Sequence, residues 1–170
     1  MRRGFYIGRF QPYHMGHHLV LEQISREVDE IIVGIGTAQI SHTVTDPFTA
    51  GERIAMIYGA LRELGRWFYI IPLPDINRNA VWVSHVKSMT PPFEVVYSNN
   101  PLVVELFMEA GMEVRRPPMY RREVYSGTVI RRLMIEGGDW RQLVPDAVAK
   151  VIDEIKGVER LRNISKKDFA

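Results

Sequence analysis

The most informative absence from this sequence is cysteine, of which the chain contains none. Disulfide frameworks, thiol nucleophiles and thiolate metal sites are therefore excluded. No apolar run approaches the length of a membrane span, and the first residues, Met1-Arg2-Arg3-Gly4, lack the apolar core of a secretory signal. These absences predict a cytoplasmic protein that has no membrane partner.

An excess of one charge sign is missing as well, because the formal net charge of the 170 residues is only +2. Such a balance gives no reason to expect a nucleic-acid partner. The hydrophobic content of 46% and charged content of 25% are typical of a globular protein, and no low-complexity linker interrupts the chain. We expect a single enzyme domain over residues 1–170.

Short apolar segments alternate with amphipathic ones along the chain. The pattern predicts strands at 5–8, 30–36, 67–73, 94–98 and 113–116, and helices at 17–28, 49–64, 80–89 and 101–110. From residue 126 to 170 the pattern is helical, with breaks at Gly137-Gly138 and Pro145. Repeated strand-helix units with right-handed crossovers predict an α/β fold, a Rossmann-like three-layer sandwich around a parallel sheet with a helical C-terminal segment.

A histidine-containing loop runs from Gly8 to His17 with the sequence Gly-Arg-Phe-Gln-Pro-Tyr-His-Met-Gly-His. It lies between the first expected strand and helix, at the edge where open α/β sheets bind ligands. Gly16 lets the backbone approach a phosphate closely, and His14 and His17 can direct both imidazoles at one oxyanion beside the helix N-terminus. Arg9 adds a guanidinium. The loop therefore predicts an anion site suited to phosphoryl chemistry.

The histidines of this loop also have plainer interpretations. His14 and His17 could be metal ligands, but the chain has no cysteine and the loop has no acidic residue, so this is disfavoured. His18 is expected to be an ordinary packing or surface residue.

A second motif, Ser-Gly-Thr-Val-Ile-Arg, begins at Ser126 and has the form of a helix start. Ser126 can cap the helix, Gly127 and Thr128 present free backbone N–H groups, and Arg131 follows about one turn later on the same side. Such an arrangement can hold the β and γ phosphates of a triphosphate. Alone it is weak, because capped helices with an arginine in the second turn are common.

Taken together, the two motifs resemble those of the HxGH nucleotidyltransferase superfamily, whose members transfer a nucleoside monophosphate from a triphosphate to a phosphate acceptor. The resemblance implies catalytic roles for Arg9, His14, His17 and Arg131. It also implies direct in-line displacement, with Mg²⁺ held through the ATP phosphates and no metal ligand supplied by the protein. The implied ATP- and phosphate-binding residues are Gly8, Arg9, Phe10, His14, Gly16, His17, Ser126, Gly127, Thr128 and Arg131.

The acceptor must be inferred from other residues. The segment Asp-Ile-Asn-Arg-Asn-Ala-Val-Trp, from Asp75 to Trp82, follows the third expected strand. Asparagine amides can satisfy a carboxamide, and the face of Trp82 can stack on a flat cationic ring. Nicotinamide mononucleotide (NMN) combines both groups with a phosphate. A simple core position for Trp82 remains equally open.

Over nearly the full length, to about Arg162, the chain resembles the archaeal nicotinamide-nucleotide adenylyltransferases. The resemblance rests on both phosphate motifs and on the segments Gly36–Gln39, Asp46–Arg53, Asn79–Val83 and Ser98–Pro101. It implies the substrates ATP and NMN, the product NAD, and a homo-oligomer such as a hexamer. The implied nicotinamide-binding residues are Ile76, Asn79 and Trp82, and those on the adenosine side are Ser98, Asn99 and Asn100.

The chain departs from that family at Thr45, where relatives carry arginine. One phosphate contact is then missing, or another basic residue such as Arg53 or Arg121 supplies it; His42 is nearby but fits a surface position better. Another acceptor, such as phosphopantetheine or flavin mononucleotide, and a non-catalytic dinucleotide sensor remain alternatives. An aminoacyl-tRNA synthetase core is disfavoured, because Lys166-Lys167 fits a solvated tail and no tRNA-binding segment is evident.

Overall fold

The computed structural model describes residues 1–166, which form a five-stranded, fully parallel sheet. Its strands are β1 (Arg3–Gly8), β2 (Glu30–Ile35), β3 (Trp67–Pro72), β4 (Val95–Tyr97) and β5 (Glu113–Arg115). The order across the sheet is β3-β2-β1-β4-β5, and Phe5 of β1 lies opposite both Ile32 and Val96. The strand order therefore reverses between β1 and β4, which is where such sheets bind ligands.

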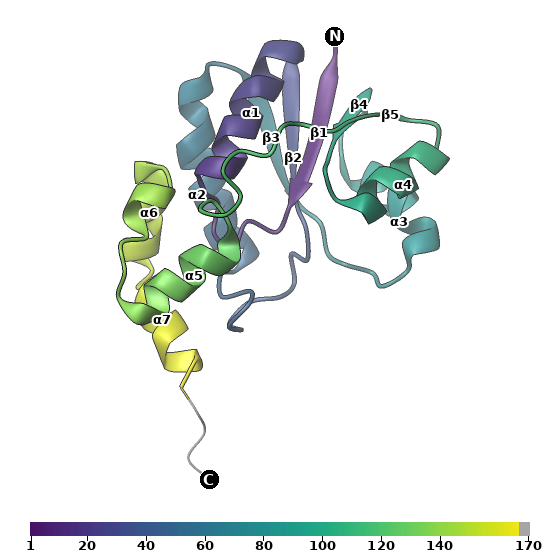
Figure 1. The fold of residues 1–170 in the computed structure, drawn as a ribbon. Helices are drawn as coiled ribbons and strands as arrows, with labels where there is room; N and C mark the ends of the chain where they lie inside the picture. The colour runs from purple at the N-terminus through teal and green to yellow at the C-terminus, as the bar shows by residue number, and fades with distance from the viewer. Residues whose placement is uncertain (167–170) are drawn as a thin grey trace.

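Helices cover both faces of the sheet, as Figure 1 shows. They are α1 (Met15–Glu27), α2 (Ala50–Leu61), α3 (Trp82–Met89), α4 (Pro101–Glu109), α5 (Gly127–Glu136), α6 (Asp146–Glu154) and α7 (Gly157–Ile164). Short 3₁₀ helices span Arg62–Leu64, Asn79–Val81 and Arg141–Leu143. α1, α2 and the C-terminal helices lie on one side of the sheet, and α3 and α4 lie on the other. The predicted Rossmann-like three-layer fold is confirmed.

Alternate residues of the strands supply two separate apolar cores. On one face Phe5, Ile32 and Val96 pack with Val86 of α3 and Phe107 of α4, all almost fully buried. The opposite face of the sheet packs against α1, α2 and the C-terminal helices. A parallel sheet buried on both faces in this way gives the nearly continuous apolar strands seen in the sequence.

Most helix boundaries follow from local capping. Thr49 and the Glu52 side chain form the predicted capping box of α2, and Ser126 accepts a hydrogen bond from the Val129 N–H at the start of α5. α1 is different, because it begins at Met15, two residues earlier than predicted. The cap is the imidazole of His14, a side chain that capping preferences do not favour.

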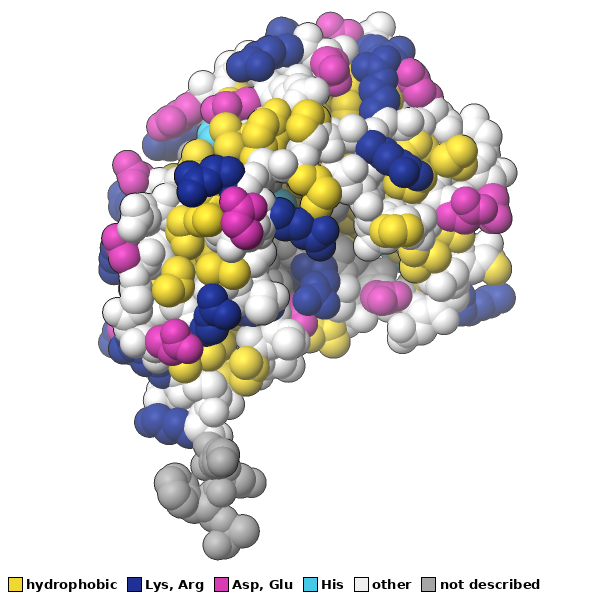
Figure 2. All heavy atoms as spheres, in the orientation of Figure 1, with side chains coloured by type: hydrophobic (Ala, Val, Ile, Leu, Met, Phe, Trp, Pro, Cys, Tyr) yellow, Lys and Arg dark blue, Asp and Glu magenta, His cyan; other side chains and the backbone are white. Residues whose placement is uncertain are grey.

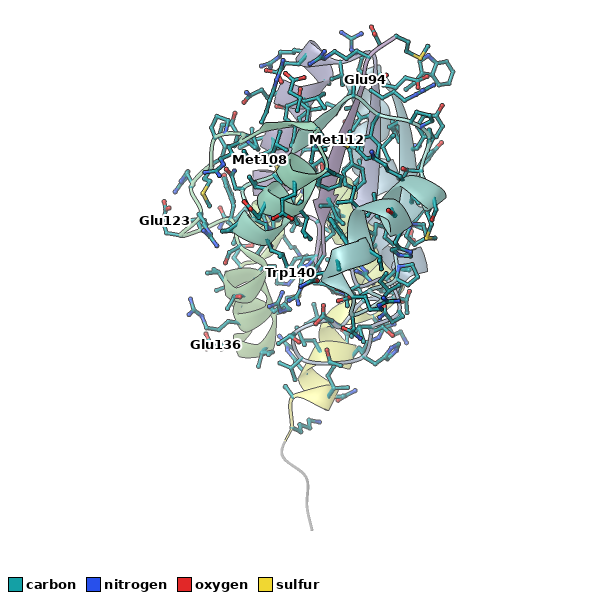
Figure 3. The ribbon with its side chains drawn as sticks, turned by 90° about the vertical axis from the view of Figure 1, so that its right-hand side faces the viewer. Glu94, Met108, Met112, Glu123, Glu136 and Trp140 are labelled. Carbon is teal, nitrogen blue, oxygen red and sulfur yellow. The ribbon has the colours of Figure 1, made fainter. Side chains whose placement is uncertain are left out.

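The C-terminal helices extend below the sheet, as Figure 3 shows with Glu136 marking the end of α5. Arg160 of α7 connects them to the body of the protein, because its guanidinium bonds Glu52 through both nitrogens and donates to the Pro47 carbonyl. None of the helices within residues 1–166 has the length and apolar character required to cross a membrane. Lys167, predicted to be solvated, lies outside the described residues.

Candidate active site

The imidazoles of His14 and His17 stack at the start of α1, with ring centroids 3.6 Å apart. The Nδ1 atom of His14 accepts a hydrogen bond from the Gly16 N–H, and that of His17 accepts one from the His14 N–H. A neutral imidazole that accepts at Nδ1 carries its proton on Nε2. The capping of α1 therefore leaves each ring with one free N–H donor.

Two aromatic side chains hold the His17 ring in place. The Phe10 ring meets it edge-on at 4.7 Å, and the Tyr13 ring lies 5.6 Å away. Phe10, which the resemblance assigned to phosphate binding, is only 2% exposed. Its side chain therefore supports His17 from beneath rather than facing solvent, and the Tyr13 hydroxyl is hydrogen-bonded to His18.

Burial lowers the pKa values of both catalytic candidates. Burial, together with the charge of Arg131, lowers the pKa of His14 to about 4. Burial and the neighbouring His14 bring the pKa of His17 well below its ordinary range. Both rings are therefore neutral at pH 7 in the free protein, so they offer polarised N–H groups and no positive charge.

This burial predicts that the free energy of unfolding decreases as the pH falls from about 6.5 towards 4, because the unfolded chain then binds protons that folded His14 and His17 exclude. We expect His14→Asn, which retains a capping side chain, to reduce that loss by about 2 kcal/mol between pH 7 and 4.5. Urea denaturation at both pH values measures it. Replacement of the exposed His42 by asparagine is the control, and equal losses in both variants would contradict the neutral burial of His14.

The second phosphate motif folds directly against the histidine loop. The Arg131 guanidinium donates to the Gln11 carbonyl at 2.7 Å and lies 3.5 Å from the Thr128 hydroxyl. A Cβ on Gly127 would stand 2.6 Å from Arg131 Nη1 and 3.3 Å from the Gln11 oxygen. A side chain at this position would push the Arg131 guanidinium aside, so Gly127 favours the contact through which the two distant motifs meet.

Two cavities open at the carboxyl edge of the sheet, on either side of the β1–β4 switch point. The first, of about 440 Å³, includes Gly8, Arg9, Gly36, Thr37, Leu73, Asp75, Asn79, Trp82 and Leu106. The second, of about 640 Å³, includes His14, Gly16, His17, Ser98, Asn99, Arg122, Tyr125, Ser126, Gly127 and Thr128. Ile7 and Asn100 line both, so the cavities adjoin. Figure 2 shows a hollow near the middle of the face, with basic side chains at its mouth.

The structure distributes the predicted site residues unevenly. The predicted adenosine-side residues and most of the phosphate-binding residues lie in the second cavity. Gly8 and Arg9 line the first cavity instead, with Asn79 and Trp82. The Trp82 side chain lines the first cavity, and its ring also packs edge-on against Phe107 at 5.6 Å. Ile76 is not among the residues that line either cavity.

Arg53 cannot supply the phosphate contact that was considered for it. Its side chain is fully buried, and its guanidinium donates to backbone carbonyls at every nitrogen. The acceptors are the carbonyl oxygens of Arg9, Gly36, Thr37, Ala38, Ile40 and Thr49. Arg121 lies over the Tyr125 ring, and it is the adjacent Arg122 that lines the second cavity. His42 is exposed, as expected.

Several residues near the cavities lie in sequence segments named above, but no individual role was predicted for them. Asp75 and Thr37 line the first cavity just beyond β3 and β2, a position that could have identified them. Asp46 is only 5% exposed, and its Oδ1 atom accepts no hydrogen bond although the Arg9 Nε atom is 3.6 Å away. Thr45 donates to the other oxygen of that carboxylate. No sequence pattern indicates the burial of Asp46.

Comparison with known proteins identifies the family. A model of the cytidylyltransferase-like family matches residues 5–133. A nicotinamide-nucleotide adenylyltransferase of Methanolobus tindarius is 61% identical over 168 residues, which cover 99% of this chain and 97% of the relative. That of Halobacterium salinarum is also 61% identical, over 99% of this chain and 95% of its own. The chain belongs to the nicotinamide-nucleotide adenylyltransferase family.

Solved structures share the fold at much lower identity. A bifunctional NMN adenylyltransferase/ADP ribose pyrophosphatase from Francisella tularensis matches with a TM-score of 0.76 and 18% identity, over 95% of this chain and 52% of that one. This chain therefore spans about half the length of the bifunctional protein. The structure of that bifunctional protein complexed with AMP and a manganese ion gives a TM-score of 0.74.

Membership of a nucleotidyltransferase family raises the question of a metal ion. Residues 1–166 contain no group of three His, Cys, Asp or Glu side chains placed to hold one. The buried carboxylate nearest the site, Asp46, faces Arg9, and a guanidinium at that distance opposes a second cation. The protein side chains alone therefore do not fit a resident metal centre.

Proposed function

We propose that this protein transfers AMP from ATP to NMN, giving NAD and pyrophosphate by direct in-line displacement. The observation that carries the proposal is the meeting of the two cavities at Ile7 and Asn100, beside the stacked histidines. A reaction that joins two nucleotides needs two adjoining pockets, with donors where the phosphates meet.

The lining of each cavity supports one substrate. The first offers the face of Trp82 and the amide of Asn79, which suit a pyridinium ring and its carboxamide. The second is larger and combines the helix start at Ser126 with His14 and His17, which suits a triphosphate. We therefore place the nicotinamide in the first cavity and ATP in the second.

In the proposed reaction an oxygen of the NMN phosphate attacks the α-phosphorus of ATP. A new phosphorus–oxygen bond forms while the bond to the oxygen bridging the α and β phosphates breaks, and pyrophosphate leaves with that electron pair. The attacking oxygen is already ionised at neutral pH, so no general base is required. The Nε2–H groups of His14 and His17 donate to the α-phosphate oxygens as negative charge gathers there.

Arginines complete the charge balance. Arg131 stands beside the Ser126 helix start, where it neutralises the triphosphate, and Arg9 lines the acceptor cavity, where it meets the NMN phosphate. Arg9 thereby supplies a basic contact that Thr45 cannot make. Mg²⁺ bound to ATP through the phosphate oxygens would lower their negative charge, with no ligand supplied by the protein.

The direct test is to incubate the purified protein with ATP, Mg²⁺ and one acceptor at a time, and to measure pyrophosphate and the dinucleotide product. NMN is expected to give NAD with stoichiometric pyrophosphate. Faster product formation with phosphopantetheine or flavin mononucleotide would replace the proposed acceptor. Tight binding of NAD without any turnover would instead indicate a dinucleotide sensor.

Trp82→Ala should separate the two cavities kinetically. We expect KM for NMN to rise by about 10–100-fold, because stacking on a cationic ring contributes roughly 1–2 kcal/mol and the removed indole also leaves a gap. KM for ATP should change by less than about twofold. Steady-state kinetics with each substrate varied in turn measure both constants, and Trp67→Ala, at an exposed position of β3, is the control. An equal rise in both KM values would contradict the assignment.

We also propose the domain organisation, cellular location and oligomeric state that the sequence predicts. Residues 1–170 act as one nucleotidyltransferase domain in the cytoplasm, and the chain associates into a homo-oligomer such as a hexamer. Sedimentation velocity of the purified protein tests the oligomeric state.

A further inference from the structure

We propose that Asp75 makes the first cavity select NMN over its deamidated counterpart, nicotinic acid mononucleotide. This inference rests on the proposed function and deepens it, because it concerns which pyridine nucleotide the same site accepts. The two acceptors differ only in that a neutral carboxamide on one ring is a carboxylate on the other.

The cavity that the exposed Asp75 lines combines apolar and neutral polar side chains and has few charges. Trp82, Leu73 and Leu106 provide ring and aliphatic surface. Among the described residues that line this cavity, the only charged side chains are Asp75 and Arg9. A substituent on the pyridinium ring therefore meets apolar surface, the neutral polar side chains of Thr37, Asn79 and Asn100, or one of these two charges.

The loop that carries Asp75 is held in place from several sides. The side-chain amide of Gln39 donates to the Asp75 carbonyl at 3.1 Å and accepts from the Asp75 N–H at 3.0 Å. His85 is hydrogen-bonded to the neighbouring Pro74 carbonyl at 2.9 Å. A loop fastened to α3 and to the segment after β2 presents its carboxylate at a fixed position before substrate arrives.

One oxygen of the Asp75 carboxylate remains available to a ligand. Oδ1 accepts a hydrogen bond from the Asn77 N–H at 2.9 Å, which fixes the rotation of the side chain. Within residues 1–166, no donor is hydrogen-bonded to Oδ2. A carboxamide NH₂ can donate to this oxygen, and the positive pyridinium ring is attracted to it.

A nicotinate carboxylate meets the opposite situation. It offers no donor to Asp75 and brings a second negative charge beside the Asp75 carboxylate, where like charges repel. Arg9 does not relieve this repulsion, because in the proposed reaction it pairs with the acceptor phosphate, and its Nε atom also lies 3.6 Å from Asp46 Oδ1.

The test is the ratio of kcat/KM for NMN to kcat/KM for nicotinic acid mononucleotide, measured with ATP saturating. For the unmodified protein we expect a ratio of at least about 10, and for Asp75→Asn a ratio below about 3, through a gain with the acid. Asparagine retains an oxygen that accepts from Asn77, so the loop is preserved. The control is Asp139→Asn, an exposed carboxylate between α5 and α6, and it should leave the ratio unchanged.

The outcomes separate this inference from the proposed function. If the unmodified protein forms no product from either pyridine nucleotide, the proposed function fails. If it turns over both at similar rates, or if Asp75→Asn leaves a high ratio within about twofold of the original, the role of Asp75 is overturned while the adenylyltransferase activity stands. A structural effect of the substitution would lower both kcat/KM values together and leave the ratio high, which also overturns it.

Discussion

His17→Ala is expected to lower the turnover number by about 10²–10³-fold while changing KM for ATP by less than about threefold. The ring is partly buried and neutral, so it contributes little long-range attraction to the ground-state triphosphate. Its fixed Nε2–H gains most when negative charge accumulates on the α-phosphate oxygens. Steady-state kinetics with ATP varied at saturating NMN separate the two constants.

His17 also stabilises the start of α1, so a control variant must separate this structural effect from the effect on catalysis. Its Nδ1 atom accepts the His14 N–H at the start of α1, and loss of such a cap typically costs about 1 kcal/mol of stability. Glutamine is well suited to this third helical position and can restore the backbone contact, but it lacks the imidazole Nε2–H. We expect His17→Gln to recover thermal stability without recovering wild-type turnover. Turnover of the alanine variant within about threefold of wild type would contradict the catalytic role.

The sequence was sufficient for the parts of the fold that depend on local pattern. The capping box at Thr49, the cap at Ser126 and the apolar strand from Glu30 all use residue types with known preferences, and the structure has each where it was predicted. The start of α1 differs from the prediction because its cap is the imidazole of His14, a residue type that capping preferences do not favour. The second half of the capping box, the bond from the His14 N–H to His17, also uses an imidazole where glutamate or glutamine is usual.

The residues of the candidate site that belong to sequence motifs could be predicted. Those whose role depends on being buried in the folded chain could not. The contact between Arg131 and the Gln11 carbonyl joins two motifs that a family resemblance had already linked. Arg53 and Asp46 are different, because a charged residue in a polar segment is normally exposed. Only the folded chain shows that backbone carbonyls surround the Arg53 guanidinium and that Asp46 lies beside Arg9.

Arg53→Met is expected to reduce the free energy of unfolding by at least about 3 kcal/mol, a large part of the roughly 5–15 kcal/mol that holds a domain folded. Methionine fills much of the volume but donates nothing, so the carbonyls of Arg9 and Gly36, whose bonds to Arg53 are partly buried, lose these donors. Urea denaturation at pH 7 measures the loss. Arg62→Met, at an exposed arginine after α2, should change stability by less than about 0.5 kcal/mol.

Arg53→Lys shows whether the same network also shapes the acceptor cavity. Lysine keeps the charge but has three donors on one atom, which cannot reach the carbonyls of both the Arg9 loop and the segment after Gly36. Gly36 and Thr37 line the first cavity, so a loosened segment should raise KM for NMN more than KM for ATP in the molecules that remain folded. If Arg53→Met were as stable as the unmodified protein, the buried guanidinium would not be what joins the two loops.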